Sequence, residues 1–201
     1  MLNLLIMPSS PALAEELSPA DAPSRALLGA ARQLVREYAS ANEELVLDIV
    51  GSRDARWHTA HTGSLRAWGA PSVQLGEGNY LPELMARYML AGGPDYHVGE
   101  VREHLDTPRA GVLTIVCVDG SAGLTQRAPL ALIDAAPAAA RWCESLLAGA
   151  DESCDEEKLR AAGVEETALW AELAALQPVK AELRAADSTL GVGRYVAGWQ
   201  C

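Results

Sequence analysis

The sequence predicts an α/β fold, a three-layer α/β/α sandwich around a central, mostly parallel sheet. Two observations support this prediction. Short apolar runs alternate along the chain with longer segments in which apolar residues recur at helical spacing. Strands that are apolar throughout are typical of parallel sheets covered by helices on both faces. The chain of 201 residues is long enough for one core, so we expect residues 1–201 to form a single domain.

The expected strands are short runs of aliphatic and β-branched residues. The clearest is VLTIVCV at 112–118, and LVLDIV at 45–50 is stopped by Gly51. The apolar run at 2–7 ends at Pro8, which cannot donate a ladder hydrogen bond. The complete set of expected strands is 2–7, 45–50, 65–68, 98–105, 112–118 and 190–199.

Helical spacing of apolar residues predicts the segments between these strands. In the first of them Leu27, Ala31, Leu34 and Tyr38 lie on one face, and Ser24 fits the N-cap. Strands that alternate with such helices imply a sheet covered on both faces. The expected helices are 25–42, 81–90, 135–147, 155–162, 166–176 and 179–186.

The composition excludes several classes of partner. Hydrophobic residues make up 49% and charged residues 21% of the chain, which are the values of a globular protein. The 27 acidic and 16 basic residues give a net charge of −11, so nucleic-acid phosphates and anionic membranes would be repelled. No apolar run approaches the roughly 20 residues that span a bilayer. We therefore expect neither nucleic acid nor a membrane as a partner.

The start of the chain and its cysteines bear on the cellular compartment. The apolar start followed by Ala12-Leu-Ala14 also fits a cleaved signal peptide, but no Lys or Arg precedes Arg25, and we favour a buried strand. The four cysteines form no C-x-x-C pair, and a chain of this length needs no disulfides. The simpler expectation is a cytoplasmic protein.

A ligand cleft is expected where three loops meet. In open α/β sheets the ligand crevice lies at the carboxyl ends of the strands, which here lead into loops 8–11, 51–63 and 119–125. The last loop is rich in glycine, which lets backbone amides approach a ligand, although a tight turn without a ligand explains the glycines equally well. The candidate cleft residues are Ser9, Ser10, Asp119, Gly120, Ser121, Gly123 and Thr125.

A metal site is the second possibility at the same edge. Asp54, His58 and His61 are spaced i, i+4, i+7 and would share one face of a helical turn. Two imidazoles and a carboxylate can bind Fe(II) or another divalent metal. Arg53 and Arg56 lie close in sequence and would weaken such a site, so a polar loop with hydrogen-bonded histidines is the alternative.

Four segments of the chain taken together form a recognisable pattern. They are Met7-Pro-Ser-Ser-Pro-Ala-Leu13, Val50-Gly-Ser-Arg-Asp54, Val118-Asp-Gly-Ser-Ala-Gly-Leu-Thr-Gln-Arg-Ala-Pro129 and Leu190-Gly-Val-Gly-Arg-Tyr-Val-Ala-Gly-Trp199. In this order they resemble the catalytic B-subunit superfamily of class III extradiol ring-cleavage dioxygenases. The likeness is greatest to a small, Ala-rich actinobacterial branch of that superfamily.

The resemblance implies a three-layer α/β/α fold with a cleft where active members hold non-haem Fe(II) by two His and one Glu. In those members the iron binds a catechol and O2, and a further His acts as acid and base. This chain departs from the pattern in three places. The turn after the first strand has no His, Leu124, Thr125 and Gln126 replace the catalytic His, and no Asp, Glu or His lies between Thr189 and Cys201.

Because its metal site is degenerate, we expect the chain to be a non-dioxygenase relative that has lost or changed the activity. It would bind a small polar or anionic molecule, or a protein partner, and no cofactor is expected. The alternative is a metal-dependent oxidoreductase of the ring-cleavage type, or a hydrolase, that uses Asp54, His58 and His61 with Fe(II) or another divalent metal. A third hypothesis is a structural subunit in which exposed Trp57 and Trp68 form a homo-oligomer interface.

Overall fold

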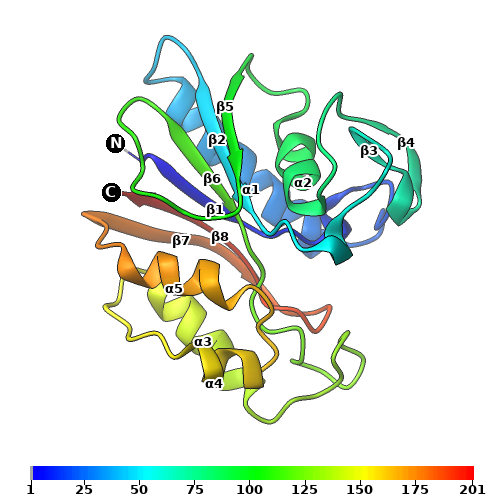
Figure 1. The fold of residues 1–201 in the computed structure, drawn as a ribbon, viewed down its shortest axis with the longest axis vertical. Helices are drawn as coiled ribbons and strands as arrows, with labels where there is room; N and C mark the ends of the chain where they lie inside the picture. The colour runs from blue at the N-terminus through cyan, green and yellow to red at the C-terminus, as the bar shows by residue number, and fades with distance from the viewer. Residues whose placement is uncertain (1) are drawn as a thin grey trace.

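The computed structural model describes residues 2–201 and contains a six-stranded sheet with the order β5-β2-β6-β1-β8-β7 (Figure 1). β5, β2, β6 and β1 are parallel, whereas β8 is antiparallel to both of its neighbours. The predicted α/β fold with a mostly parallel central sheet is therefore confirmed. Its strands are β1 (Leu4–Met7), β2 (Val46–Gly51), β5 (His97–Arg102), β6 (Leu113–Cys117), β7 (Lys180–Asp187) and β8 (Arg194–Gln200).

In residues 2–201, five α-helices form the layers on either side of the sheet (Figure 1). α1 (Ala22–Ala39) and α2 (Leu81–Leu90) pack with one face of the sheet in a first core. α3 (Ala136–Leu147), α4 (Glu156–Ala161) and α5 (Thr167–Ala175) pack with the other face in a second core. Within the described part of the chain, none of the helices has the length and apolar character needed to cross a bilayer.

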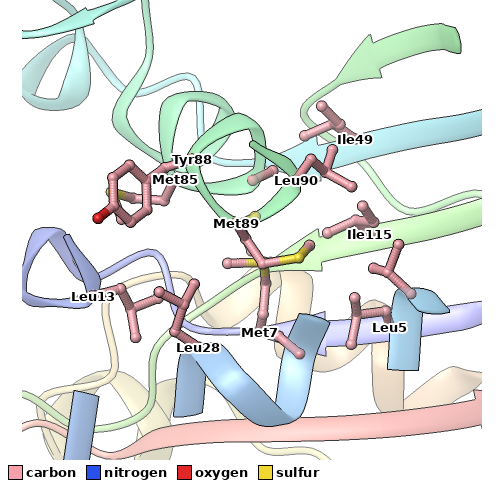
Figure 2. Close-up of a cluster of buried hydrophobic side chains, with 14 of the residues drawn as sticks. Leu5, Met7, Leu13, Leu28, Ile49, Met85, Tyr88, Met89, Leu90 and Ile115 are labelled. Atoms are coloured by element: carbon pink, nitrogen blue, oxygen red, sulfur yellow. The ribbon is translucent and has the colours of Figure 1, made fainter. Parts of the chain in front are cut away.

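The central strand β1 supplies side chains to both cores. Leu5 and Met7 belong to the first core, where Met89 of α2 lies beside Met7 (Figure 2). Leu4 and Ile6 point to the opposite face and belong to the second core. This alternation explains why residues 4–7 are apolar throughout, because neither face of β1 meets solvent.

The prediction of a helix at 179–186 is wrong, because β7 forms the edge of the sheet there. Ala181, Leu183 and Ala185 are half-buried, and the residues between them are exposed. This period of two is that of a strand. Ala181 and Leu183 pack against the second core, and Ala185, which follows a register shift, packs against the first. Lys, Glu, Arg, Ala and Leu all favour helices, so the composition of the segment is misleading.

A small sheet of two short strands lies outside the main one. β3 (Ser64–Leu65) begins where the sequence predicts a strand at 65–68, but residues 66–68 turn into a 3-10 helix. Its partner β4 (Ala70–Gln74) is not predicted from the sequence. The segment reads APSVQ, and its Pro and short length weaken the pattern of a strand.

Arg194, the first residue of β8, is fully buried and joins three elements. Its guanidinium forms ion pairs with Asp187, the last residue of β7, and with Asp21, the N-cap of α1. It also donates a hydrogen bond to Ser24 Oγ at 2.5 Å. Two carboxylates thus balance the charge of this buried arginine, which is the arrangement that a buried charge requires.

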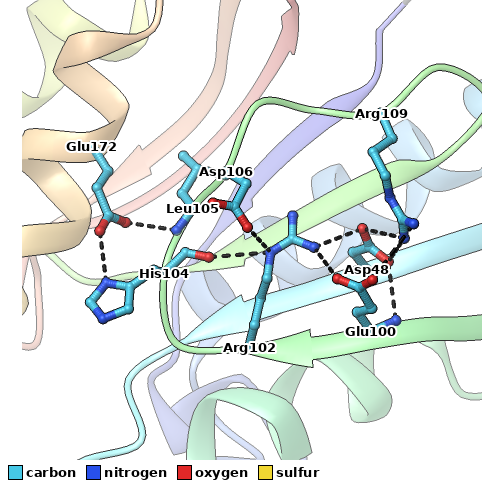
Figure 3. A network of polar contacts seen from close by, with 8 residues as sticks. All are labelled: Asp48, Glu100, Arg102, His104, Leu105, Asp106, Arg109 and Glu172. Carbon is cyan, nitrogen blue, oxygen red and sulfur yellow. Dashed lines mark hydrogen bonds and ion pairs between the residues drawn. The ribbon is translucent and has the colours of Figure 1, made fainter.

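Asp48 in the middle of β2 is a second fully buried charge (Figure 3). Its carboxylate accepts hydrogen bonds from Arg102 at 3.0 Å and from Arg109 at 2.8 and 3.0 Å. The backbone N–H of Glu100 donates to the same carboxylate at 3.1 Å. Asp48 therefore attaches the edge strand β5, and the loop that follows it, to the interior of the sheet.

Candidate functional site

The loops after β1, β2 and β6 leave the sheet at one level, which we call the carboxyl edge. Met7 at the end of β1 and Gly51 at the end of β2 are both in register with Cys117 at the end of β6. The residues before β8 lie at this edge as well, because β8 runs antiparallel to β1. Long-range contacts at this edge can therefore join the three loops that the sequence singles out.

The Gly-rich loop 119–125 packs against the protein with its own backbone amides. Gly120 N–H donates to the Gly193 carbonyl at 2.7 Å, and Ala122 N–H donates to the Gly163 carbonyl at 2.8 Å. Leu124 N–H donates to the Gly191 carbonyl at 3.0 Å. These three amides donate to carbonyls of the protein itself, as expected if the loop is a tight turn that binds no ligand.

Ser121 and the neighbouring glycines have structural contacts too. The Ser121 hydroxyl is fully buried, donates to the Ala162 carbonyl at 2.5 Å and accepts from Gly123 N–H at 3.1 Å. A Cβ on Gly120 would lie 2.8 Å from the ring of Tyr195. Glycine at this position therefore makes room for a packed ring. Thr125 and Ser10 are partly buried at the two ends of this region.

Ser9 and Asp119 are the predicted cleft residues that the structure joins directly. Ser9 is buried and donates from Oγ to Asp119 Oδ2 at 2.5 Å. The indole N–H of Trp170 donates to the Asp119 carbonyl at 2.9 Å. Burial raises the pKa of the Asp119 carboxyl to about 6, against the hydrogen bonds from Ser9 and the charge of Arg194. Asp119 Oδ1 is buried and accepts no hydrogen bond within residues 2–201.

Glu166, which immediately precedes α5, is the residue that sequence reasoning missed. Its side chain is 9% exposed and accepts a hydrogen bond from the indole N–H of Trp57 at 3.2 Å. Burial raises the pKa of Glu166 to about 7, and the charges of Asp119 and Glu165 act in the same direction. Arg56 and the Trp57 hydrogen bond oppose this rise in pKa. The carboxyl is thus held near the midpoint of its titration at neutral pH.

Glu166 lies on the wall of a cavity of about 260 Å³ at the carboxyl edge. The loop after β2 contributes Ser52, Asp54 and Arg56 to this wall, and the segments before and within α4 and α5 contribute most of the remainder. Five carboxylate side chains and two arginines line the cavity. Both arginines are already paired, Arg56 with Glu165 at 3.1 Å and Arg160 with Thr167 Oγ1 at 3.0 Å.

His104, after β5, also lines this cavity and is held by α5 (Figure 3). Its Nδ1 lies 2.8 Å from a carboxylate oxygen of Glu172, and the backbone N–H of Leu105 donates to the other oxygen at 2.7 Å. The hydrogen bond with Glu172 raises the pKa of His104 above its ordinary value. Glu172 therefore fixes the position of the β5 loop and favours the charged form of the imidazole.

The structure does not arrange Asp54, His58 and His61 as the predicted metal site requires. Only residues 55–57 form a helical turn, a 3-10 helix, and Asp54 caps it by accepting from Arg56 N–H at 3.0 Å. His58 is extended and meets the ring of Tyr80 edge-on, with 5.1 Å between ring centroids. In residues 2–201 no three His, Cys, Asp or Glu side chains are grouped to hold a metal ion. Binding of Fe(II) by this trio would require loop 51–63 to rearrange.

The tryptophans of the third hypothesis are partly buried. Trp57 and Trp68 both pack against the first core, and Trp57 also donates its indole N–H to Glu166. Their apolar surface is therefore used largely within the chain. They do not form the exposed pair on which an oligomer interface was predicted.

No protein-family model matches the chain, and no curated protein matches it significantly in sequence.

Proposed function

We propose that the chain binds a small polar molecule in the cavity at the carboxyl edge and exchanges a proton with it through Glu166. We further propose that it is a non-dioxygenase relative of the extradiol B subunits. The observation that carries the first proposal is the Glu166 carboxyl, which is nine-tenths buried on the cavity wall. Both of its protonation states are populated near neutral pH, as general acid–base chemistry requires.

The charges around the cavity favour a neutral or positively charged ligand over an anionic one. Carboxylates outnumber arginines on the wall, and Arg56 and Arg160 already have partners. An anion would have to displace one of these ion pairs and approach the remaining carboxylates. A hydroxyl or ammonium group can instead donate a hydrogen bond to Glu166 in its ionised form.

Three two-carbon probes of different charge test this proposal: ethanolamine, ethylene glycol and glycolate. We expect ethanolamine and ethylene glycol to shift the NMR signals of the cavity residues, with the Glu166 carboxyl carbon among them, more than glycolate does. Glu166→Gln should remove these shifts. The matched variant Glu157→Gln, an exposed residue of α4 outside the cavity wall, should retain them. Absence of shifts with all three probes, or equal shifts in Glu166→Gln, contradicts the proposal.

The stability of the protein should depend on pH through Glu166. The pKa of Glu166 is raised from 4.5 to about 7, so between these values the folded chain binds a proton that the unfolded chain releases. The stabilisation from this group is present below pH 4.5 and is lost as the pH rises through 7. From pH 4.5 to pH 8 the wild type should lose up to about 3 kcal/mol more than Glu166→Gln does. Urea denaturation at several pH values measures this difference, and parallel curves for the two proteins would contradict it.

A further inference from the structure

A second cavity, of about 440 Å³, lies between α3 and α4 and shares no lining residue with the cavity of Glu166. We propose that it is a separate site for a small, flat aromatic molecule that carries a positively charged amine. α4 separates the two cavities: Glu156 and Arg160 line the first, whereas Lys158 and Leu159 line the second. The volume is within the range of small-molecule pockets in proteins.

The shape of this cavity comes from small side chains beside one large ring. Ala135, Ala138 and Ala139 of the α3 region leave the space open, and Trp142, one turn further along the helix, forms a wall. The indole is fixed in place, because its N–H donates to the Ser153 carbonyl at 3.1 Å. It also packs edge-on against Trp170, with 5.9 Å between ring centroids. An immobilised indole is a surface on which a flat aromatic ring can stack at little entropic cost.

The charged side chains of this cavity favour a ligand of positive charge. Glu152, Asp155 and Lys158 are the charged residues of this cavity. Lys158 is 85% exposed and pairs with Asp155 at 3.0 Å, so these two charges compensate each other. Glu152 accepts from the Ser145 hydroxyl at 2.7 Å, and within residues 2–201 it has no ion-pair partner. A carboxylate without a cation, beside an indole wall, complements an aromatic amine and adds a cation–π attraction.

Three naphthalene probes of similar size and different charge test the site: 1-naphthylmethylamine, 1-naphthalenemethanol and 1-naphthoate. Binding to the full chain is followed by the NMR signal of the Trp142 indole N–H and by titration calorimetry. We expect the amine to shift this signal and to bind at least tenfold more tightly than 1-naphthoate. Equal affinity for the three probes, or a Trp142 signal that none of them moves, overturns the proposal.

Four variants locate the binding. Ala138→Leu, at an exposed helix position on the cavity wall, should weaken binding of 1-naphthylmethylamine at least tenfold. Ala161→Leu on α4 should have the same effect and provides a second test. Ala26→Leu, an exposed position on α1, is the matched control and should bind normally. Glu152→Gln should reduce the affinity for the amine to that for the alcohol. If the chain instead sediments as a dimer that Ala138→Leu dissociates, a second copy covers the cavity and the proposal is wrong.

Discussion

Replacement of Arg194 by alanine is expected to lower the free energy of unfolding by about 3–5 kcal/mol. Arg194 is fully buried, and its guanidinium pairs with Asp21 and Asp187, which are themselves mostly buried. Without the arginine, two carboxylates would remain in a poorly solvated place with no cation to balance them. The pKa of Asp119 should also rise further, because the charge of Arg194 lowers it in the wild type.

The control for this prediction is Arg184→Ala on the neighbouring strand. Arg184 pairs with Glu37 at 3.1 Å and with Glu182 at 2.9 Å, but its side chain is 29% exposed and those of the two glutamates are nearly half exposed. Exposed ion pairs contribute little, so we expect a loss of at most about 1 kcal/mol. Urea denaturation of both variants measures the difference. A loss in Arg194→Ala no larger than that in Arg184→Ala would show that burial of this charge is not what makes it important.

The second large effect is expected for Asp48→Ala, at about 3 kcal/mol. The substitution removes the acceptor of Arg102, Arg109 and the Glu100 N–H at one time. Arg102 would still form ion pairs with Glu100 at 2.9 Å and with Asp106 at 3.6 Å. We therefore expect a loss of stability at the lower end of the range for broken buried ion pairs. Amide hydrogen exchange should accelerate first in β5, because Asp48 holds that edge strand.

Glu100→Ala is the matched variant for Asp48→Ala. Its carboxylate contacts the same two arginines but is more than half exposed. We expect it to cost less than about 1 kcal/mol. Asp48→Asn keeps an acceptor for the Glu100 N–H while removing the charge, so its cost should fall between the other two. Equal denaturation midpoints for Asp48→Ala and Glu100→Ala would refute the role assigned to Asp48.

The inner strands β1, β2 and β6 were predictable because burial on both faces requires apolar residues at nearly every position. The run at 112–118 contains all of β6, and the run at 45–50 differs from β2 by one residue at each end. The prediction of a helix at 179–186 was wrong for a physical reason as well. This edge strand is only half-buried, and the helical preference of its residues outweighs the short alternation of Ala and Leu with charged residues.

The candidate site was predictable only in part, because its residues come from distant segments. Parallel strands that end together predict that Ser9 and Asp119 approach each other, and they do. Glu166 lies 109 positions beyond its partner Trp57, and a pair of glutamates before a helix is an ordinary sequence pattern. The glycines of loop 119–125 indicate close backbone approach correctly, but the sequence does not say whether the approaching group is a ligand or the protein itself.

The position of β1 between β6 and β8 has a consequence for folding during synthesis. Among the strands of this sheet β1 is made first, yet one of its two neighbours, β8, consists of residues 194–200. Until the ribosome has released those residues, β1 can pair with β6 but keeps an open edge on the other side. An open, apolar strand edge is a template for pairing with other chains. Before the β7–β8 hairpin emerges, the nascent chain therefore presents this edge of β1 to other chains, and the sheet closes only once residues 194–200 have been made.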